Sequence, residues 1–312
     1  MSDRRGFFRD LLREAAGVAQ ELSAALQAAE PEEDDLVPKL PAKPATSAVN
    51  ETTLLALCHE VGLAHREDDV RHYTRRSVRL THGDATSRSR LGGVPDLPPG
   101  FVWPSWQGRE LGFLAQVDLE AVAAVDPETI LPGHGVLSFF SDVGGGRCVV
   151  RLVDGELEPV ERRRQARPEY PLELSRELML PGGWSFRAEE LDLTPDERDA
   201  WDELRDRLAR AQGVELEETS LRPSVLHRLL GYHEEVGREV EVDCALGAAG
   251  LDAGDDDVYH EHRAALEADA RRWRLLLQVS AEGPDGFERL YVCIRDDDLR
   301  SGRFDGAWAV SR

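Results

Sequence analysis

His227 is the residue with the most recognisable chemistry, because an imidazole with an ordinary pKa of about 6.5 can exchange a proton near neutral pH. It belongs to the run His227-Arg228-Leu229-Leu230-Gly231-Tyr232, which ends on a phenol. A general base needs a nucleophile or a carboxylate within reach, and the sequence assigns neither to His227. Two hypotheses stay open: an enzyme of unassigned reaction with a pocket near His227 and Tyr232, or a structural histidine in the core.

Two tryptophans could bind a ligand by stacking. Trp103 and Trp106 lie in the segment Leu91–Gln116, which is rich in glycine and proline and then continues as an apolar strand. Proline fixes φ and removes an amide donor, and glycine adopts angles closed to other residues, so the segment predicts a loop of fixed shape. Its rings either pin the loop onto the core or form the rim of a groove for a ligand.

Two glutamines occupy matching places in apolar stretches. Leu114-Ala115-Gln116-Val117-Asp118 resembles Leu276-Leu277-Gln278-Val279-Ser280, and an apolar strand follows each. The similarity predicts a weak internal repeat and hence two related sheet units. A buried amide needs hydrogen-bond partners, so Gln116 and Gln278 either bond to nearby loop backbone or face a pocket between the two units.

One basic patch stands out in an acidic chain. The sequence has 312 residues, with 38 Lys and Arg against 60 Asp and Glu, and a formal net charge of −22. The patch lies in a predicted strand, Val70–Leu80, and shortly after it. These arginines either balance surface charge or bind an anion or an acidic partner. They are Arg71, Arg75, Arg76, Arg79, Arg88 and Arg90.

The composition also bears on partners and location. The negative charge repels phosphate backbones, so nucleic-acid binding is not expected, whereas a basic protein partner would suit it. No transmembrane segment is predicted. Widely spaced cysteines without a Cys-x-x-Cys pair are typical of buried free thiols in a cytoplasmic protein. They are Cys58, Cys148, Cys244 and Cys293.

No metal or cofactor site is predicted from residue spacing. His260 and His262 are two residues apart, hence about 200° apart around a helix, and cannot share an ion. The triple glycine Gly144–Gly146 precedes a strand, whereas a phosphate loop requires a helix there. The acidic run Asp252–Asp257 lacks the spacing and the glycine of a calcium loop.

The chain predicts three parts: an amphipathic helical arm at 1–29, an acidic and proline-rich linker at 30–49, and a folded domain at 50–312. The start Arg4-Arg5-Gly6-Phe7-Phe8 resembles a twin-arginine export signal, but charged residues interrupt the apolar run that such a signal needs. The arm is predicted to dock on the domain or to serve as a handle for a partner or a membrane surface.

The domain is predicted to be α+β, with a mainly antiparallel sheet and flanking helices. Residues 161–181 are predicted to be irregular because they are highly charged. Strands are expected at 111–117, 136–140 and 148–153, the last two as a hairpin, and helices at 119–125, 195–212 and 257–272.

Several motifs resemble the DUF1963 family, the YwqG-like proteins, over roughly Asn50 to the C-terminus. They are Leu91-Gly92-Gly93-x-Pro95-x-Leu97-Pro98, Phe101-x-Trp103-Pro104, Leu111-x-Phe113-Leu114-x-Gln116-Val117-Asp118-Leu119, the run from His227 to Tyr232, and Trp273–Val279. The resemblance implies an α+β fold and no established activity. The family usually has a proline after the Gly-Tyr pair, where this chain has His233.

The sequence therefore predicts an uncharacterised bacterial, cytoplasmic binding or interaction protein that takes a basic protein partner or a small ligand. The alternatives are the enzyme near His227 and Tyr232, and an accessory factor tethered through the N-terminal helix. No catalytic residue, metal or cofactor is assigned. The candidate ligand-binding residues are Trp103, Trp106, Gln116, His227, Tyr232 and Gln278.

Overall fold

The computed structural model describes residues 49–83, 87–142, 147–161, 168–214, 227–233, 239–251, 256–283 and 286–311. All of them belong to one compact unit, Lys43–Arg312. The predicted arm at 1–29 and nearly all of the predicted linker at 30–49 lie outside the described residues, so both remain predictions.

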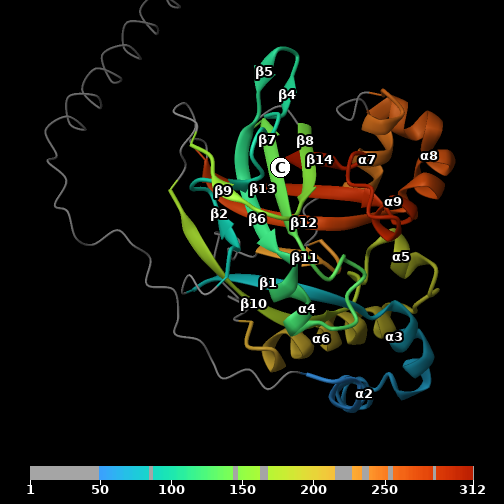
Figure 1. Cartoon of the computed structure of the whole chain (residues 1–312). Helices are drawn as coiled ribbons and strands as arrows, with labels where there is room; N and C mark the ends of the chain where they lie inside the picture. Colours follow the sequence, from blue (N-terminus) through green and yellow to red (C-terminus); the bar gives the residue numbers. More distant parts are fainter. Residues whose placement is uncertain are drawn as a thin grey trace, which may run out of the picture. The chain divides into compact units, whose positions relative to one another are not determined.

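A ten-stranded antiparallel sheet forms the centre of this unit (Figure 1), in the order β14-β13-β12-β11-β1-β10-β2-β6-β7-β8. The predicted α+β class is thereby confirmed. The strands are β1 (Arg75–His82), β2 (Arg90–Leu91), β6 (Gly112–Asp118), β7 (Val136–Asp142), β8 (Arg147–Val153), β10 (Tyr170–Met179), β11 (His227–Leu230), β12 (Trp273–Gly283), β13 (Gly286–Arg295) and β14 (Trp308–Ser311). Short pairs form two further sheets: β3 (Asp96–Leu97) with β9 (Glu158–Pro159), and β4 (Ser105–Trp106) with β5 (Arg109–Glu110).

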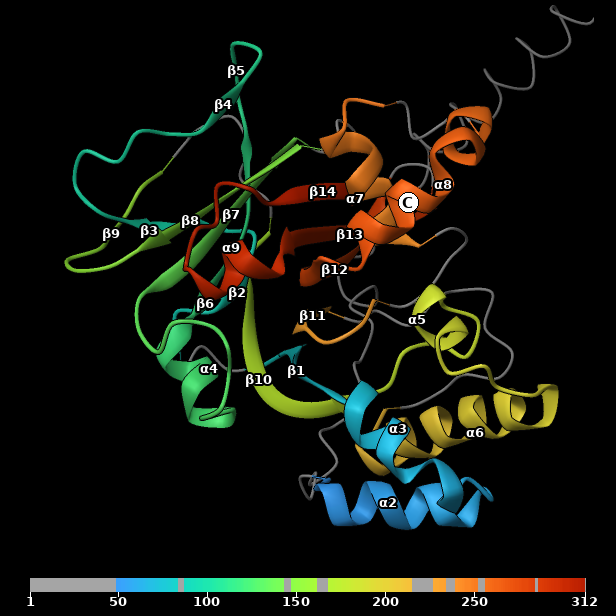
Figure 2. The same cartoon turned by 90° about the vertical axis from the view of Figure 1, so that its right-hand side faces the viewer.

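The long curved strand β10 joins two halves of the sheet (Figure 2). Its residues 172–179 pair with β1, whereas Tyr170 and Pro171 pair with β2. We call β2-β6-β7-β8 the first half and β11-β12-β13-β14 the second half. Because β10 and β1 lie between them, each half continues outward from one central strand.

The two halves repeat the same register. Arg90 pairs with Gln116 in the first half, and Arg228 pairs with Gln278 in the second. The register between the second and third strand of each half shifts at the leucine two residues before the glutamine, Leu114 or Leu276. The two related sheet units predicted from the glutamine contexts therefore share both a pairing pattern and a β-bulge.

Helices pack around this sheet in two groups. Helices α2, α3 and α6 enclose a core around Trp201, Leu54 and Leu178, and α7 and α8 pack with β12 and β13 around Trp273. The helices are α2 (Glu51–Glu60), η1 (Ala64–Arg66), α3 (Glu67–Tyr73), α4 (Leu119–Val125), α5 (Phe186–Glu189), α6 (Pro195–Ala211), α7 (Val240–Ala248), α8 (Asp256–Ala270) and α9 (Asp296–Arg300). None of the described helices is long and apolar enough to cross a membrane.

Local predictions were right where caps and periodicity agreed, and wrong in two segments. Helix α6 begins with the capping box of Thr194 and Glu197. Val70–Tyr73 was predicted as strand but is helical, because three acidic residues favour the first turn of α3. The segment 170–179 was predicted as irregular but is β10, in which Leu172, Leu174 and Leu178 follow the two-residue period beneath the charges.

Candidate functional site

A cavity of about 480 Å³ lies against the central strands of the sheet and the second half. Residues of β1, β10, β11 and β12 line it, together with α2 and the loop 126–130. The cavity is therefore bounded by the two central strands, β1 and β10, and by the first two strands of the second half, β11 and β12.

Five arginines line the cavity: Arg71, Arg75, Arg76, Arg176 and Arg274. Three of them have a carboxylate partner, in the pairs Arg71–Glu51 at 2.9 Å, Arg76–Glu128 at 2.5 Å and Arg274–Asp296. Arg75 and Arg176 have no carboxylate partner among the described residues. The lining also includes the acidic Glu51, Asp126 and Glu128, so its formal charge is +2 in a chain with a net charge of −22.

Arg75 is the least satisfied of these side chains. Its guanidinium lies over the ring of Tyr232, 4.4 Å from the ring centre, and its buried Nη1 has no hydrogen-bond partner among the described residues. Burial lowers the pKa of Arg75 to about 10, so the side chain still carries its charge at neutral pH. The Tyr232 hydroxyl donates to the Tyr73 carbonyl at 2.7 Å, which fixes the ring beneath Arg75.

A second cavity, of about 310 Å³, shares Arg75 and Arg274 with the first. Its other basic side chains are Arg271, Arg272 and Arg295, and its acidic ones are Asp296 and Asp297. The two shared arginines therefore border both cavities, and the positive region extends from the sheet toward the end of α8.

The wall of the larger cavity contains a strained turn. Leu230 and Gly231 both line it, with φ of 59° and 77°. A leucine at positive φ costs about 1 kcal/mol or more, and such strain collects at functional sites. A Cβ at Gly231 would lie 2.6 Å from Met179 Sδ and 2.7 Å from Ser77 Cβ, so this turn is tightly packed against β1 and β10.

The predicted site residue His227 is buried, with 4% of its surface exposed, and is not among the residues that line the cavity. Its Nδ1 accepts a hydrogen bond from the Ser280 backbone N–H at 3.1 Å, which assigns the proton of the neutral ring to Nε2. Burial, followed by the nearby His82, lowers the pKa of His227 to about 4. A structural role accounts for these contacts, and an acid–base role remains a hypothesis.

The two predicted glutamines lie in different halves, with four strands between β6 and β12 in the sheet. Gln116 is fully buried and accepts from the Asp96 backbone N–H at 2.9 Å. Its amide group donates to the Arg88 carbonyl at 2.7 Å and to Asp96 Oδ2 at 3.0 Å. Gln116 thus forms hydrogen bonds to the backbone of a nearby loop, which was one of the two interpretations of its sequence context. Gln278 is fully buried as well.

The predicted tryptophans differ in environment. Trp103 packs edge-on against Phe140, with ring centres 5.0 Å apart, and donates its ring N–H to the Leu111 carbonyl at 2.8 Å. Trp106 lies on β4 and is 40% exposed. Neither is among the cavity-lining residues. Of the six predicted residues, Tyr232 contacts Arg75 of the cavity, and ligand binding by the six remains a prediction.

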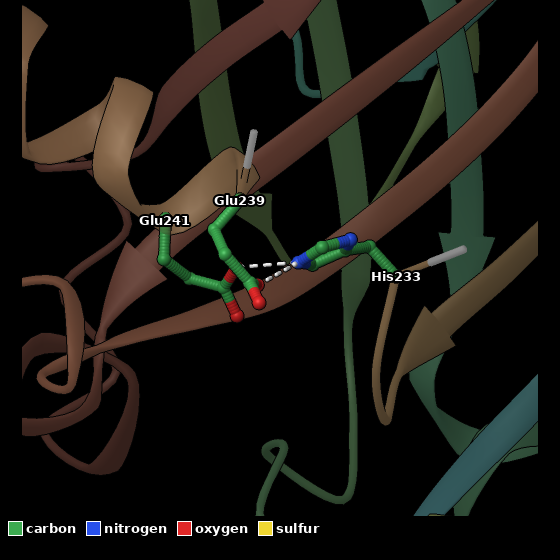
Figure 3. A group of neighbouring side chains, drawn as sticks. All are labelled: His233, Glu239 and Glu241. Atoms are coloured by element: carbon green, nitrogen blue, oxygen red, sulfur yellow. Dashed lines mark hydrogen bonds and ion pairs between the residues drawn. The ribbon is translucent and has the colours of Figure 1, made fainter. Parts of the chain in front are cut away.

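A separate buried cluster lies at the start of α7 (Figure 3). His233 Nε2 is 2.6 Å from Glu241 Oε2 and 3.2 Å from Glu239 Oε2. Burial alone would lower the pKa of His233, but the two carboxylates outweigh burial and raise this pKa well above its ordinary value. Burial alone would raise the pKa of Glu241, but His233 and Arg187 lower it to about 2.

Part of the arginine-lined cavity was predicted from the sequence, whereas the cluster of His233, Glu239 and Glu241 was not. Arg71, Arg75 and Arg76 belong to the basic patch for which anion binding was one interpretation. Arg176 and Arg274 come from distant strands, and no spacing rule connects them to the patch. The departure at His233 was visible in the sequence, but its carboxylate partners were not.

A family model described as "Domain of unknown function (DUF1963)" matches residues 89–311. The chain therefore belongs to this family. A search of curated proteins finds no match.

Proposed function

We propose that this chain, as a member of the DUF1963 family, binds a small anionic ligand in the arginine-lined cavity. The observation that carries the proposal is Arg75, a half-buried side chain whose buried Nη1 has no hydrogen-bond partner, and whose guanidinium has no carboxylate partner, among the described residues. An unpaired buried charge destabilises a fold unless something compensates for it. A carboxylate or phosphate would supply that compensation, because its oxygens match the forked N–H donors of arginine.

The volume and the lining of the cavity indicate which kind of ligand it can hold. A volume of about 480 Å³ suits a small molecule, since such pockets span roughly 300–1,000 Å³. Leu54, Leu178, Leu230 and Leu275 line the cavity beside the arginines. The proposed ligand therefore has an anionic group directed at Arg75 and an apolar part against these leucines.

Calorimetric titration of the full chain would test this proposal with inorganic phosphate, adenosine monophosphate and octanoate as probes. Arg75→Met keeps an apolar contact with Tyr232 but removes the charge, so we expect it to weaken binding at least tenfold. Because this variant also removes an unsatisfied buried N–H, we expect it to unfold no more easily than the wild type.

The matched control is Arg210→Gln, which changes an exposed arginine on α6 outside the cavity and should leave affinity unchanged. The proposal is wrong if no probe binds the wild type, or if the probes bind Arg75→Met as tightly as the wild type.

A basic protein partner is the second candidate, favoured by the net charge of −22. Its attraction would weaken with rising salt, because ions screen exposed charges. A partner recovered at low salt and lost at high salt would support this candidate, whereas recovery independent of salt would contradict it.

We also propose a cytoplasmic location, which the four free, buried cysteines favour. The N-terminal arm as a tether remains a further proposal.

A further inference from the structure

We propose that His233, Glu239 and Glu241 form a binding site for a divalent transition-metal ion. The three residues present one nitrogen and two carboxylate oxygens that all lie within 4.8 Å of one another. Figure 3 shows both carboxylates directed at the same edge of the imidazole. The site is distinct from the arginine-lined cavity and does not depend on the function proposed for it.

The donor set and spacing fit zinc and its neighbours. Imidazole nitrogen and carboxylate oxygen are both zinc ligands, and three protein ligands with an open fourth position are typical of catalytic zinc. Tetrahedral ligands at about 2.0 Å from an ion lie roughly 3.3 Å from one another. The 3.2 Å contact between His233 Nε2 and Glu239 Oε2 already has this separation. The 2.6 Å contact with Glu241 would have to widen by about 0.7 Å, which small rotations of the glutamate allow.

The surrounding protein holds each carboxylate by its other oxygen. Glu239 Oε1 accepts from the Phe186 backbone N–H at 2.9 Å, so Oε2 is left toward His233. Glu241 Oε1 faces Arg187 at 3.7 Å, and its Oε2 is the oxygen near the imidazole. Contacts of this kind orient the ligands of metal sites and leave one oxygen of each carboxylate for the ion.

Burial separates this group from an ordinary surface cluster. His233 is 5% exposed and Glu241 is 2% exposed, whereas the Glu239 side chain is 17% exposed and gives a route from solvent. The buried Nδ1 of His233 has no hydrogen-bond partner among the described residues. The hydrogen bonds of the cluster therefore leave the imidazole incompletely satisfied. An ion would replace the proton that Nε2 shares with the carboxylates and would leave one or more positions for water.

The test is titration of the full chain with Zn²⁺ against a chromophoric chelator, together with Co²⁺, whose visible absorption reports its coordination. We expect one ion to bind per chain, and we expect a visible spectrum typical of Co²⁺ coordinated by nitrogen and oxygen atoms. Glu239→Gln keeps the acceptor for Phe186 and removes a charged ligand, so affinity should fall at least tenfold. His233→Gln should remove the Co²⁺ spectrum.

The matched control is His262→Gln, an exposed histidine on α8, which should bind metal like the wild type. Melting in the presence of EDTA would establish that each variant is folded. The inference is overturned if the wild type binds no stoichiometric ion, or if folded Glu239→Gln and His233→Gln proteins bind Zn²⁺ as tightly as the control. In either case the cluster is an ion pair that fixes the start of α7.

Discussion

The two halves of the sheet use the same scaffold but differ in the turn that follows their first strand. In the first half, β2 leads into Gly92 and Gly93, with φ of 63° and 69°. In the second half, Leu230 at the end of β11 and the following Gly231 have φ of 59° and 77°. The backbone therefore makes the same pair of left-handed residues twice, once without strain and once with a leucine. The strained copy is the one that lines the cavity.

A second difference concerns the residue before the paired arginine. In the first half, Ser89 Oγ accepts from the Asp118 backbone N–H at 3.0 Å. In the second half, His227 Nδ1 accepts from the Ser280 backbone N–H at 3.1 Å. The acceptor changes from a hydroxyl to an imidazole while the hydrogen bond stays. This equivalence is the strongest argument that His227 is structural.

The surroundings of the two turns also differ. In the first half, Asp96 closes the loop by bonding to Gln116 and pairing with Arg90 at 2.7 Å. In the second half, the corresponding turn borders a cavity with Arg75, which has no carboxylate partner in the described part of the chain. The first half therefore closes its turn with side-chain contacts, and the second half borders the cavity for which ligand binding is proposed.

The largest effect should come from adding a methyl group to the second turn. Gly231→Ala would place its Cβ against Met179 and Ser77 at positive φ, so we expect a loss of about 3–5 kcal/mol in the free energy of unfolding. In Gly93→Ala the closest atom is the Glu169 carboxylate oxygen, at the end of a side chain that is 48% exposed and can rotate away, while Glu169 Cβ at 2.8 Å would have to shift slightly. We expect about 1–2 kcal/mol there. Urea unfolding of both variants checks this, and equal losses would contradict it.

The next largest effect is a loss of folding stability at low pH that comes from His227 in the second half. Because His227 has a pKa of about 4 in the fold against an ordinary 6.5, the unfolded chain binds its proton first as the pH falls. Stability should therefore be lost between pH 6.5 and pH 4, by about 3 kcal/mol from this residue.

His227→Ser places at this position the residue that the first half has at Ser89, whose hydroxyl can accept the same backbone hydrogen bond. The variant should therefore lose this part of the pH dependence of stability. Other carboxylates and histidines titrate in both proteins and largely cancel when the two stability curves are subtracted. Urea unfolding at several pH values measures the difference. If the wild type and His227→Ser lose stability in parallel, His227 is already protonated in the fold and its assigned environment is wrong.

Sequence reasoning recovered features that depend on neighbouring residues and missed those that depend on register. The capped helix α4 was predicted with its observed bounds, Leu119–Val125, and the contexts of Gln116 and Gln278 indicated the repeat. The correspondence of Arg90 with Arg228 needs the strand pairing, which no local pattern contains. That Arg75 has no carboxylate partner among the described residues was equally hidden, because partners such as Glu128 of Arg76 and Asp296 of Arg274 come from other segments.

A smaller effect should follow from replacing the buried glutamine of the first half. Gln116→Leu would leave the Asp96 N–H and the Arg88 carbonyl without their buried partner, and we expect a loss of about 2–3 kcal/mol. Gln278→Leu, at the equivalent position, should cost a similar amount if the halves are equivalent. Chemical unfolding of both proteins measures this, and a tolerated Gln116→Leu would show that the loop does not depend on the amide.

The smallest effect is expected at Trp106, in the segment that has no counterpart in the second half. Strands β3, β4 and β5 lie between β2 and β6, whereas α7 and α8 lie between β11 and β12. Since Trp106 is 40% exposed and is not among the cavity-lining residues, Trp106→Ala should change stability by less than about 0.5 kcal/mol and leave anion affinity unchanged. Calorimetric titration with the probe that binds the wild type checks the second expectation. If Trp106→Ala weakens binding while Arg75→Met does not, the tryptophan loop of the first half is the ligand site, and the division of roles between the halves is reversed.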